Sequence, residues 1–162
     1  MIQLQVFQAE RQQEVIDLIL PIQQQEFGLD IDLARQPDLT DIAGFYQQGC
    51  GNFWLALHQQ QLVGCVGLLD IGQGQAALRK MFVATPYRGS QWGVANRLLQ
   101  QLLQWAQQQS LRDLYLGTTA QFHAAQRFYH KQGFTLIDPQ QLPASFPRMA
   151  VDSLFYHYPV NR

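Results

Sequence analysis

Charged residues are scarce in this sequence. Only 14% of its 162 residues are Asp, Glu, Lys or Arg, and their formal net charge is −1 with histidine neutral. Proteins that bind nucleic acid or an anionic membrane surface usually carry a surplus of Lys and Arg. We therefore expect no nucleic-acid partner. Much of the polarity comes instead from glutamine, which is scattered along the whole chain and does not form a low-complexity tract.

Cysteine and long apolar runs are also scarce. Cys50 and Cys65 are the only cysteines, without CxxC spacing or neighbouring metal-ligand residues, so we predict two free thiols and no metal site. No apolar run reaches membrane-spanning length. The first residues alternate like a strand and lack the charged start and cleavage site of a leader peptide. These absences predict no membrane partner and a cytoplasmic location.

The apolar content is sufficient for a hydrophobic core. Hydrophobic residues make up 47% of the chain and aromatic residues 12%, which argues against disorder. A chain of this length fits one domain, and no internal repeat or linker-like segment divides it. We predict a single domain over residues 1–162.

Hydrophobic periodicity predicts alternating groups of strands and helices. Pro21 should end or kink the first helix, and Asp38 is positioned to cap a short second one. In chain order the expected elements are a strand over 1–7, a helix over 10–25, a short helix opening at 37, strands over 52–57, 61–69 and 77–83, a helix over 93–109, a strand over 111–117, a helix over 121–131, and strands over 134–137 and 153–158. This order predicts an α/β (α+β) fold in which helices cover a mixed sheet.

The most informative segment lies between residues 78 and 99. It reads as a strand, a short basic turn that contains glycine, and a long amphipathic helix. A helix N-terminus entered through such a turn presents unpaired N–H groups and a positive dipole end, which suits a phosphate. The turn lacks the Lys-Ser/Thr pair of a nucleotide P-loop, so we expect a phosphate held mainly by backbone amides.

Two motifs give the chain a resemblance to the GCN5-related N-acetyltransferase (GNAT) family. One is this strand–turn–helix, with Met81-Phe82-Val83, Tyr87-Arg88-Gly89 and Gly93-Val94-Ala95. The other is Ala125-Gln126-Arg127-Phe128-Tyr129-His130-Lys131-Gln132-Gly133-Phe134, which is similar to the family pattern A-x-x-[FL]-Y-x-x-x-G-F. The resemblance covers nearly the full length. It implies a mostly antiparallel sheet of about seven strands with about four helices, acetyl-CoA as cosubstrate and no metal.

The resemblance also implies roles for individual residues. The backbone at Met81, Phe82 and Val83 would pair with the pantetheine arm, and Tyr129 would give a proton to the leaving thiolate. Trp92 would partly cover the cofactor or pack into the sheet. The residues implied in holding the pyrophosphate are Arg88, Gly89, Ser90, Gln91, Trp92, Gly93, Val94 and Ala95.

The chain departs from the family pattern in three places. The usual turn of the family is Q/R-x-x-G-x-G/A. Either Ser90 stands here in place of the Gln or Arg, or Arg88 is that Arg and the turn is longer than usual. We favour the longer turn, with Arg88 near a phosphate. Phe122 replaces a cofactor-binding Asn, whose polar contact is either missing or supplied by Thr118 or Thr119. Residues 76–80 contain no carboxylate where many members carry the Glu that deprotonates the amine.

The sequence leaves the general base, the acceptor and the oligomeric state open. Asp70, His123 or solvent acting on a neutral amine are the alternatives for the base. Arg148, in a Pro-rich loop over 139–149, is either solvated or lines the acceptor pocket and attracts an acidic substrate. The chain is either a monomer or a homodimer, in which the apolar strand 154–156 would pair across the interface.

The predicted function is transfer of an acetyl group from acetyl-CoA to a primary amine of a small-molecule or peptide acceptor. Transfer is expected to be direct, in a ternary complex, because neither cysteine lies in a motif typical of a nucleophile. The alternative is a module that binds CoA or an acyl-CoA without turnover. A nucleotide-phosphate enzyme is disfavoured by the lack of a Walker lysine.

Overall fold

Seven strands form one sheet in the computed structural model, which describes residues 1–160. The strand order is β1-β2-β3-β4-β5-β7-β6, and all neighbours are antiparallel except β4 and β5. The strands are β1 (Ile2–Val6), β2 (Asn52–His58), β3 (Gln61–Gly72), β4 (Gln75–Val83), β5 (Asp113–Thr118), β6 (Thr135–Ile137) and β7 (Leu154–Pro159). The predicted α/β fold with a mostly antiparallel sheet is confirmed.

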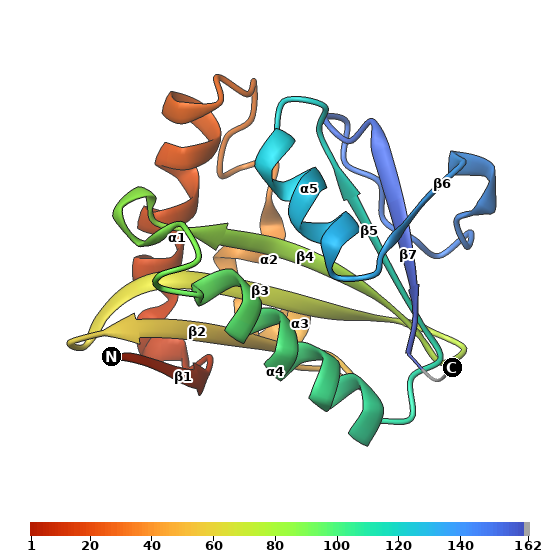
Figure 1. Cartoon of the computed structure of the whole chain (residues 1–162), viewed down its shortest axis with the longest axis horizontal. Coiled ribbons are helices and arrows are strands. Elements are labelled where there is room, and N and C mark those ends of the chain that lie inside the picture. The colour runs from red at the N-terminus through yellow and green to blue at the C-terminus, as the bar shows by residue number, and fades with distance from the viewer. Residues whose placement is uncertain (161–162) are drawn as a thin grey trace.

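Helices cover both faces of this sheet (Figure 1). The α-helices are α1 (Gln12–Pro21), α2 (Pro37–Thr40), α3 (Ile42–Tyr46), α4 (Val94–Gln108) and α5 (His123–Lys131), and the shorter turns are η1 (Ala9–Arg11), η2 (Ile22–Glu26), η3 (Thr85–Tyr87) and η4 (Pro139–Gln141). In Figure 1, α4 and α5 lie on the near face and α1 to α3 on the far face. Because β2 is covered on both sides, Trp54 faces the core under α4 while Phe53 and Leu55 face the core under α1 and α3.

The segment before β2 agrees with the prediction at Pro21 and differs at Asp38. Pro21 ends α1, and the chain continues as the π-type turn η2. Asp38 lies inside α2 and is not its N-cap, while Asp41 caps a separate helix, α3, by accepting the N–H of Gly44 at 3.0 Å. The side chain of Asp38 is instead buried against Tyr46, so a tertiary contact prevails over local capping.

The C-terminal strand β7 lies inside the sheet. Its backbone pairs with β5 on one side and with β6 on the other. Residues 155 and 156 have strand neighbours on both sides within the chain, so their backbone is not available for edge-to-edge pairing with a second chain, and the homodimer stays a prediction. Among the described residues, the edge strands of the sheet are β1 and β6.

The parallel neighbours β4 and β5 separate after a short contact. They pair only through residues 75–77 and 113–115, although both strands continue beyond these residues, and Figure 1 shows them diverging. A bulge interrupts β4 in the part that no longer pairs with β5. There Lys80 takes a left-handed φ of 57°. Arg79 and Lys80 both reach the α2–α3 side of the sheet. There Arg79 contacts Phe45 and Lys80 contacts Asp38.

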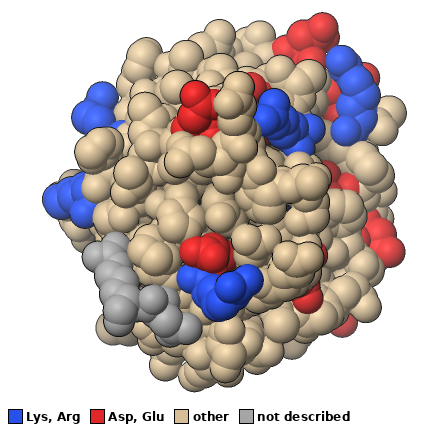
Figure 2. Space-filling view, turned by 90° about the vertical axis from the view of Figure 1, so that its right-hand side faces the viewer, with Lys and Arg blue, Asp and Glu red and all other residues tan. Residues whose placement is uncertain are grey.

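Two surface findings complete the fold. No helix of residues 1–160 is both long enough and apolar enough to cross a membrane. On the face that Figure 2 shows, Lys, Arg, Asp and Glu are scattered among uncharged residues and form no extended basic patch.

Candidate functional site

The separation of β4 and β5 leaves a cavity of about 90 Å³, here called the inner cavity. Its walls come from β4, β5, α5 and the loop that precedes β7. The polar side chains that line it are Gln23, Arg79, Lys80, Thr118, Thr119, Tyr129 and Asp152. This small set combines one phenol, one carboxylate and two cations, so it contains both a potential proton donor and a potential proton acceptor.

Tyr129 points from α5 into the wall of the inner cavity. Its ring packs on Phe134 and Tyr156, with centroid distances of 5.5 and 6.2 Å. The hydroxyl has no hydrogen-bond partner among residues 1–160. Burial raises the pKa of the Tyr129 phenol, so the group is protonated at neutral pH. This is the protonation state that a general acid requires.

Thr119 contributes a second unused hydroxyl. Its Oγ1 is buried and has no hydrogen-bond partner in the described part of the chain, and the residue lines the inner cavity. Leaving such a group unpaired costs about 1–3 kcal/mol. Of the two threonines offered as a polar contact in place of the missing Asn, Thr119 is therefore the one whose hydroxyl is fully buried without a partner.

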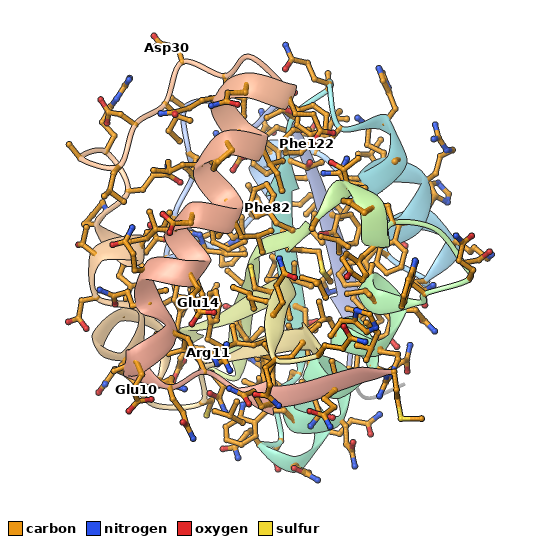
Figure 3. All side chains as sticks on the ribbon, turned by 90° about the vertical axis from the view of Figure 1, so that its left-hand side faces the viewer. Glu10, Arg11, Glu14, Asp30, Phe82 and Phe122 are labelled. Carbon is orange, nitrogen blue, oxygen red and sulfur yellow. The ribbon has the colours of Figure 1, made fainter. Side chains whose placement is uncertain are left out.

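Phe122, at the start of α5, forms an apolar wall of the inner cavity. Its ring contacts those of Phe27 and Phe82 edge-on, with centroid distances of 4.4 and 6.5 Å. In Figure 3 the labelled Phe82 and Phe122 lie near the end of α1. These three rings connect the segment after η2 with β4 and α5, so Phe122 provides packing rather than a hydrogen bond.

The turn before α4 leads into the N-terminus of that helix. In the described residues no side chain caps the first turn of α4, and Gly93 at the N-cap position has a left-handed φ of 62°. A Cβ at Gly64 would lie 2.8 Å from the side chain of Val94, so α4 packs closely on β3 beside Val83. The free amides at the start of α4 thus lie near the end of β4.

Arg88 and Trp92 contact protein groups within this turn. The Arg88 guanidinium binds both carboxylate oxygens of Glu26, and its Nε donates to the carbonyl of Val83 at 2.8 Å. Trp92 packs on Tyr87, with ring centroids 4.8 Å apart, and on His58 of β2, at 5.1 Å; its predicted contact with the cofactor stays a prediction. The predicted phosphate contact of Arg88 stays a prediction. The Val83 carbonyl already accepts a hydrogen bond from Arg88.

Removing the carboxylate of Glu26 tests this contact. Glu26→Gln is expected to lower the free energy of unfolding by about 0.2–1 kcal/mol, because the ion pair is partly exposed to solvent. Its hydrogen bond to Arg88 lowers the pKa of Glu26, so the stabilisation is present above the unfolded-state pKa and is lost as pH falls. Urea unfolding at pH 7 and pH 4 measures both effects, and Glu14→Gln, which breaks the ion pair with Arg11, is the control. Equal loss at both pH values would contradict this assignment.

A larger cavity of about 350 Å³, here called the outer cavity, lies against the inner one. It is bounded by α2, α3, β4 and the loop that precedes β7, and the two cavities share Arg79, Met149 and Val151. Arg148, for which the sequence left open a solvated position or a place in the acceptor pocket, lines this cavity, and its contact with an acidic substrate stays a prediction. Sequence reasoning gave Arg79 no role, although the β4 bulge turns its side chain into the boundary between the two cavities.

A buried polar cluster separates the two cavities. Lys80 Nζ lies 3.4 Å from the carboxylate of Asp38 and donates to Gln36 Oε1 at 2.8 Å. The Tyr46 hydroxyl donates to the same carboxylate at 2.6 Å. Burial lowers the pKa of Lys80, and the charge of Asp38 opposes that shift. Because these groups satisfy one another, they form a fixed wall rather than a reactive centre.

Asp152 is the acidic residue that borders the inner cavity. Its carboxylate lies against Gly117 of β5, where an added Cβ would be 2.6 Å from Oδ2. It makes no ion pair within residues 1–160, and only a 3.4 Å contact from the Met149 N–H reaches it. Burial raises the pKa of Asp152, while Met149 and the charges of Arg79 and Lys80 act in the opposite direction. The sequence signal that was missed is that Asp152 is the only acidic residue between 139 and 160.

The alternatives expected for the base lie elsewhere. Asp70 accepts the N–H groups of Cys50 and Gly72, and His123 is exposed on α5; neither lines the inner or the outer cavity. The two cysteines, predicted as free thiols, are free, and neither lines a cavity. Within residues 1–160 no three His, Cys, Asp or Glu side chains gather as a metal site.

Comparison with known proteins places this site in a family context. The model of the Acetyltransferase (GNAT) family matches residues 16–134. N-acetylaspartate synthetase of Danio rerio is 30% identical over 131 residues, which are 78% of this chain and 45% of that protein. N-acetyltransferase 8F1 of Rattus norvegicus is 28% identical over 127 residues, 75% of this chain and 57% of that protein. The chain spans about half the length of these curated relatives.

Solved structures of acetyltransferases share the fold of this chain. A GNAT-family acetyltransferase from Staphylococcus aureus Mu50 superposes with a TM-score of 0.96 at 36% identity, covering 99% of this chain and 100% of that one. An N-acetyltransferase from Thermoplasma acidophilum in complex with coenzyme A shares the fold, with a TM-score of 0.73 at 14% identity and coverage of 98% and 99%. With the two sequence motifs, the sheet topology and these matches, the chain belongs to the GNAT acetyltransferase family.

Proposed function

We propose that this protein transfers an acetyl group from acetyl-CoA directly to a primary amine in the inner cavity. One observation carries the proposal: β4 and β5 separate around a cavity that holds the unpartnered hydroxyls of Tyr129 and Thr119. When bound, acetyl-CoA supplies an acetyl group activated as a thioester. Relatives named as N-acetyltransferases support an amine acceptor.

The residues on the β4–α4 side fit the cosubstrate. The turn from Arg88 to Ala95 would hold the pyrophosphate on the free amides of α4. The backbone around Met81 would align the pantetheine arm, with Phe122 as an apolar wall. Thr119 would give its unused hydroxyl to the same ligand. Coenzyme A in the complex from Thermoplasma acidophilum supports this choice of cosubstrate.

We assign the two catalytic proton transfers, from the ammonium and to the departing sulfur, to Asp152 and Tyr129, and two further transfers restore these residues. Asp152 accepts a proton from the acceptor's ammonium, which frees the nitrogen lone pair for attack on the acetyl carbon. As the C–N bond forms and the C–S bond breaks, Tyr129 gives its proton to the departing sulfur. The second proton on the nitrogen restores the phenol of Tyr129 through water, and Asp152 releases its proton to solvent. Lys80 is a weaker base candidate because its ammonium is already bound by Asp38 and Gln36.

Calorimetric titration with acetyl-CoA tests the proposal. We expect micromolar binding, with ATP–Mg²⁺ as a ligand that does not bind. Thr119→Val should weaken acetyl-CoA binding up to about tenfold, because one hydrogen bond is lost, while stability stays equal or rises since a buried unpaired hydroxyl is removed. Thr135→Val, on the exposed strand β6, is the matched control.

The outcomes separate the candidate functions. Absence of acetyl-CoA binding would overturn the proposal. Binding without CoA release in the presence of any amine would favour the alternative, a module that binds CoA without turnover. An unchanged affinity in Thr119→Val would remove Thr119 from the cosubstrate site and leave the remainder intact.

A further inference from the structure

The outer cavity carries positive charge that its own carboxylates do not neutralise. Arg35, Arg79 and Arg148 line it together with Asp30 and Asp38. Arg35 pairs with Asp30 and also with Asp32, each at 3.3 Å, and Asp38 is occupied by Lys80 and the Tyr46 hydroxyl. Within residues 1–160, Arg79 and Arg148 form no ion pair with a carboxylate.

Arg79 is held at the boundary between the two cavities. Its guanidinium carbon lies 5.6 Å from the ring centroid of Phe45, and it makes no hydrogen bond with the described residues. Stacking on an aromatic ring restrains the guanidinium plane and leaves its edge N–H donors available. Arg148 lies farther out, 5.3 Å from the ring centroid of Phe155, and donates to the carbonyl of Pro139 at 2.8 Å. Arg79 is therefore the preoriented and unused donor.

This charge pattern disfavours a plain amine. An ammonium that reaches Asp152 must approach the guanidinium of Arg79, which lines the inner cavity and, unlike Lys80, is paired with no carboxylate among residues 1–160. Like charges at short range in a partly buried site repel strongly. A carboxylate on the acceptor, placed on Arg79, would remove this repulsion and form a two-pronged, charge-assisted hydrogen bond.

We infer that the acceptor is an amino-acid-like amine whose carboxylate, close to the reacting nitrogen, binds Arg79 in the outer cavity. This inference rests on the proposed function, because it names the substrate class of the same site. The carboxylate must lie near the amine since Arg79 borders both cavities. A volume of about 350 Å³ accommodates the remainder of a small molecule.

Matched acceptors test the inference. Steady-state CoA release is measured with each L-amino acid and with its amide, which keeps the amine and removes the carboxylate charge. The wild type should use an amino acid with the lower KM. Arg79→Gln should raise the KM for that amino acid about ten- to hundredfold and leave the KM for the amide unchanged or lower, because the repulsion of the ammonium is removed as well. Arg79→Lys should restore part of the difference, because it keeps the charge and loses the planar fork.

A charge control and a binding measurement make the test specific. Arg35→Gln removes the same charge from the same cavity, but Arg35 is already paired, so a small effect is expected. In the presence of CoA, an N-acetyl-L-amino acid should bind more tightly than its amide in calorimetry, and Arg79→Gln should abolish the preference. If acetyl-CoA itself fails to bind, the proposed function falls. If acetyl-CoA binds but amides are used or bound as well as amino acids, or Arg35→Gln matches Arg79→Gln, the inference is overturned.

Discussion

Asp152→Asn should lower kcat by about 10²–10⁴-fold at neutral pH, the range expected when a general base is removed. The amide keeps the size of the carboxylate but cannot accept a proton from an ammonium. The wild-type carboxylate borders the inner cavity and forms no ion pair within the described residues, so little else is lost with its charge. Acetyl-CoA affinity should stay close to that of the wild type.

The stability of this variant separates catalysis from structure. Burial raises the pKa of Asp152, so the folded state binds its proton more tightly than the unfolded state does. Protonation of this group therefore favours folding below its unfolded-state pKa, and that contribution is lost as pH rises through the folded-state pKa. Asp152→Asn removes an unpaired, partly buried charge, so its unfolding free energy at neutral pH should equal or exceed that of the wild type.

A pH profile of kcat/KM provides the measurement. For the wild type, the rate should fall on the acidic side as Asp152 becomes protonated, and this fall begins above the ordinary carboxyl range because the pKa is raised. For Asp152→Asn, activity should recover in part at high pH, where the amine arrives neutral. Asp70→Asn is the matched control, since Asp70 only bonds backbone amides. Full activity in Asp152→Asn, or an equal loss in Asp70→Asn, would contradict the assignment.

The order of elements and the two motifs could be predicted from the sequence because both depend on local patterns. Alternation and helical spacing report which faces are buried, and the Tyr129 motif lies on one continuous helix. The bulge at Lys80 could not be predicted in this way, since a left-handed φ at lysine is unfavourable locally. It lies where the register of β4 on β3 shifts, and Arg79 beside it lines the outer cavity.

The missed residues share a physical reason. Asp152, in the loop before β7, acquires its surroundings from Gly117 of β5, and the absence of a Cβ at Gly117 makes room for the carboxylate. Asp38 was expected to act locally as a cap, but its partners Tyr46 and Lys80 come from two other elements. Contacts between distant segments have no periodic signature, so the loop before β7 contributed only Arg148 to the sequence-based site.

Tyr129→Phe is expected to lower kcat by about 10²–10⁴-fold while changing KM for acetyl-CoA little. The ring remains, so its packing on Phe134 and Tyr156 is kept. The hydroxyl has no partner among residues 1–160, so its removal should leave the unfolding free energy equal or slightly higher. What is lost is the proton for the departing sulfur, which otherwise leaves as a thiolate.

Tyr156→Phe is the matched control, because its ring lies beside Tyr129 without lining the inner cavity. Single-turnover measurements with a preformed complex of enzyme and acetyl-CoA isolate the transfer step from cosubstrate binding. A Tyr129→Phe enzyme within about threefold of the wild-type rate would exclude the phenol as general acid, since even modest proton-transfer catalysis exceeds that factor. A loss shared equally by Tyr156→Phe would assign the effect to aromatic packing. A loss confined to Tyr129→Phe, together with unchanged stability and unchanged acetyl-CoA affinity, requires the hydroxyl to act on the reacting atoms.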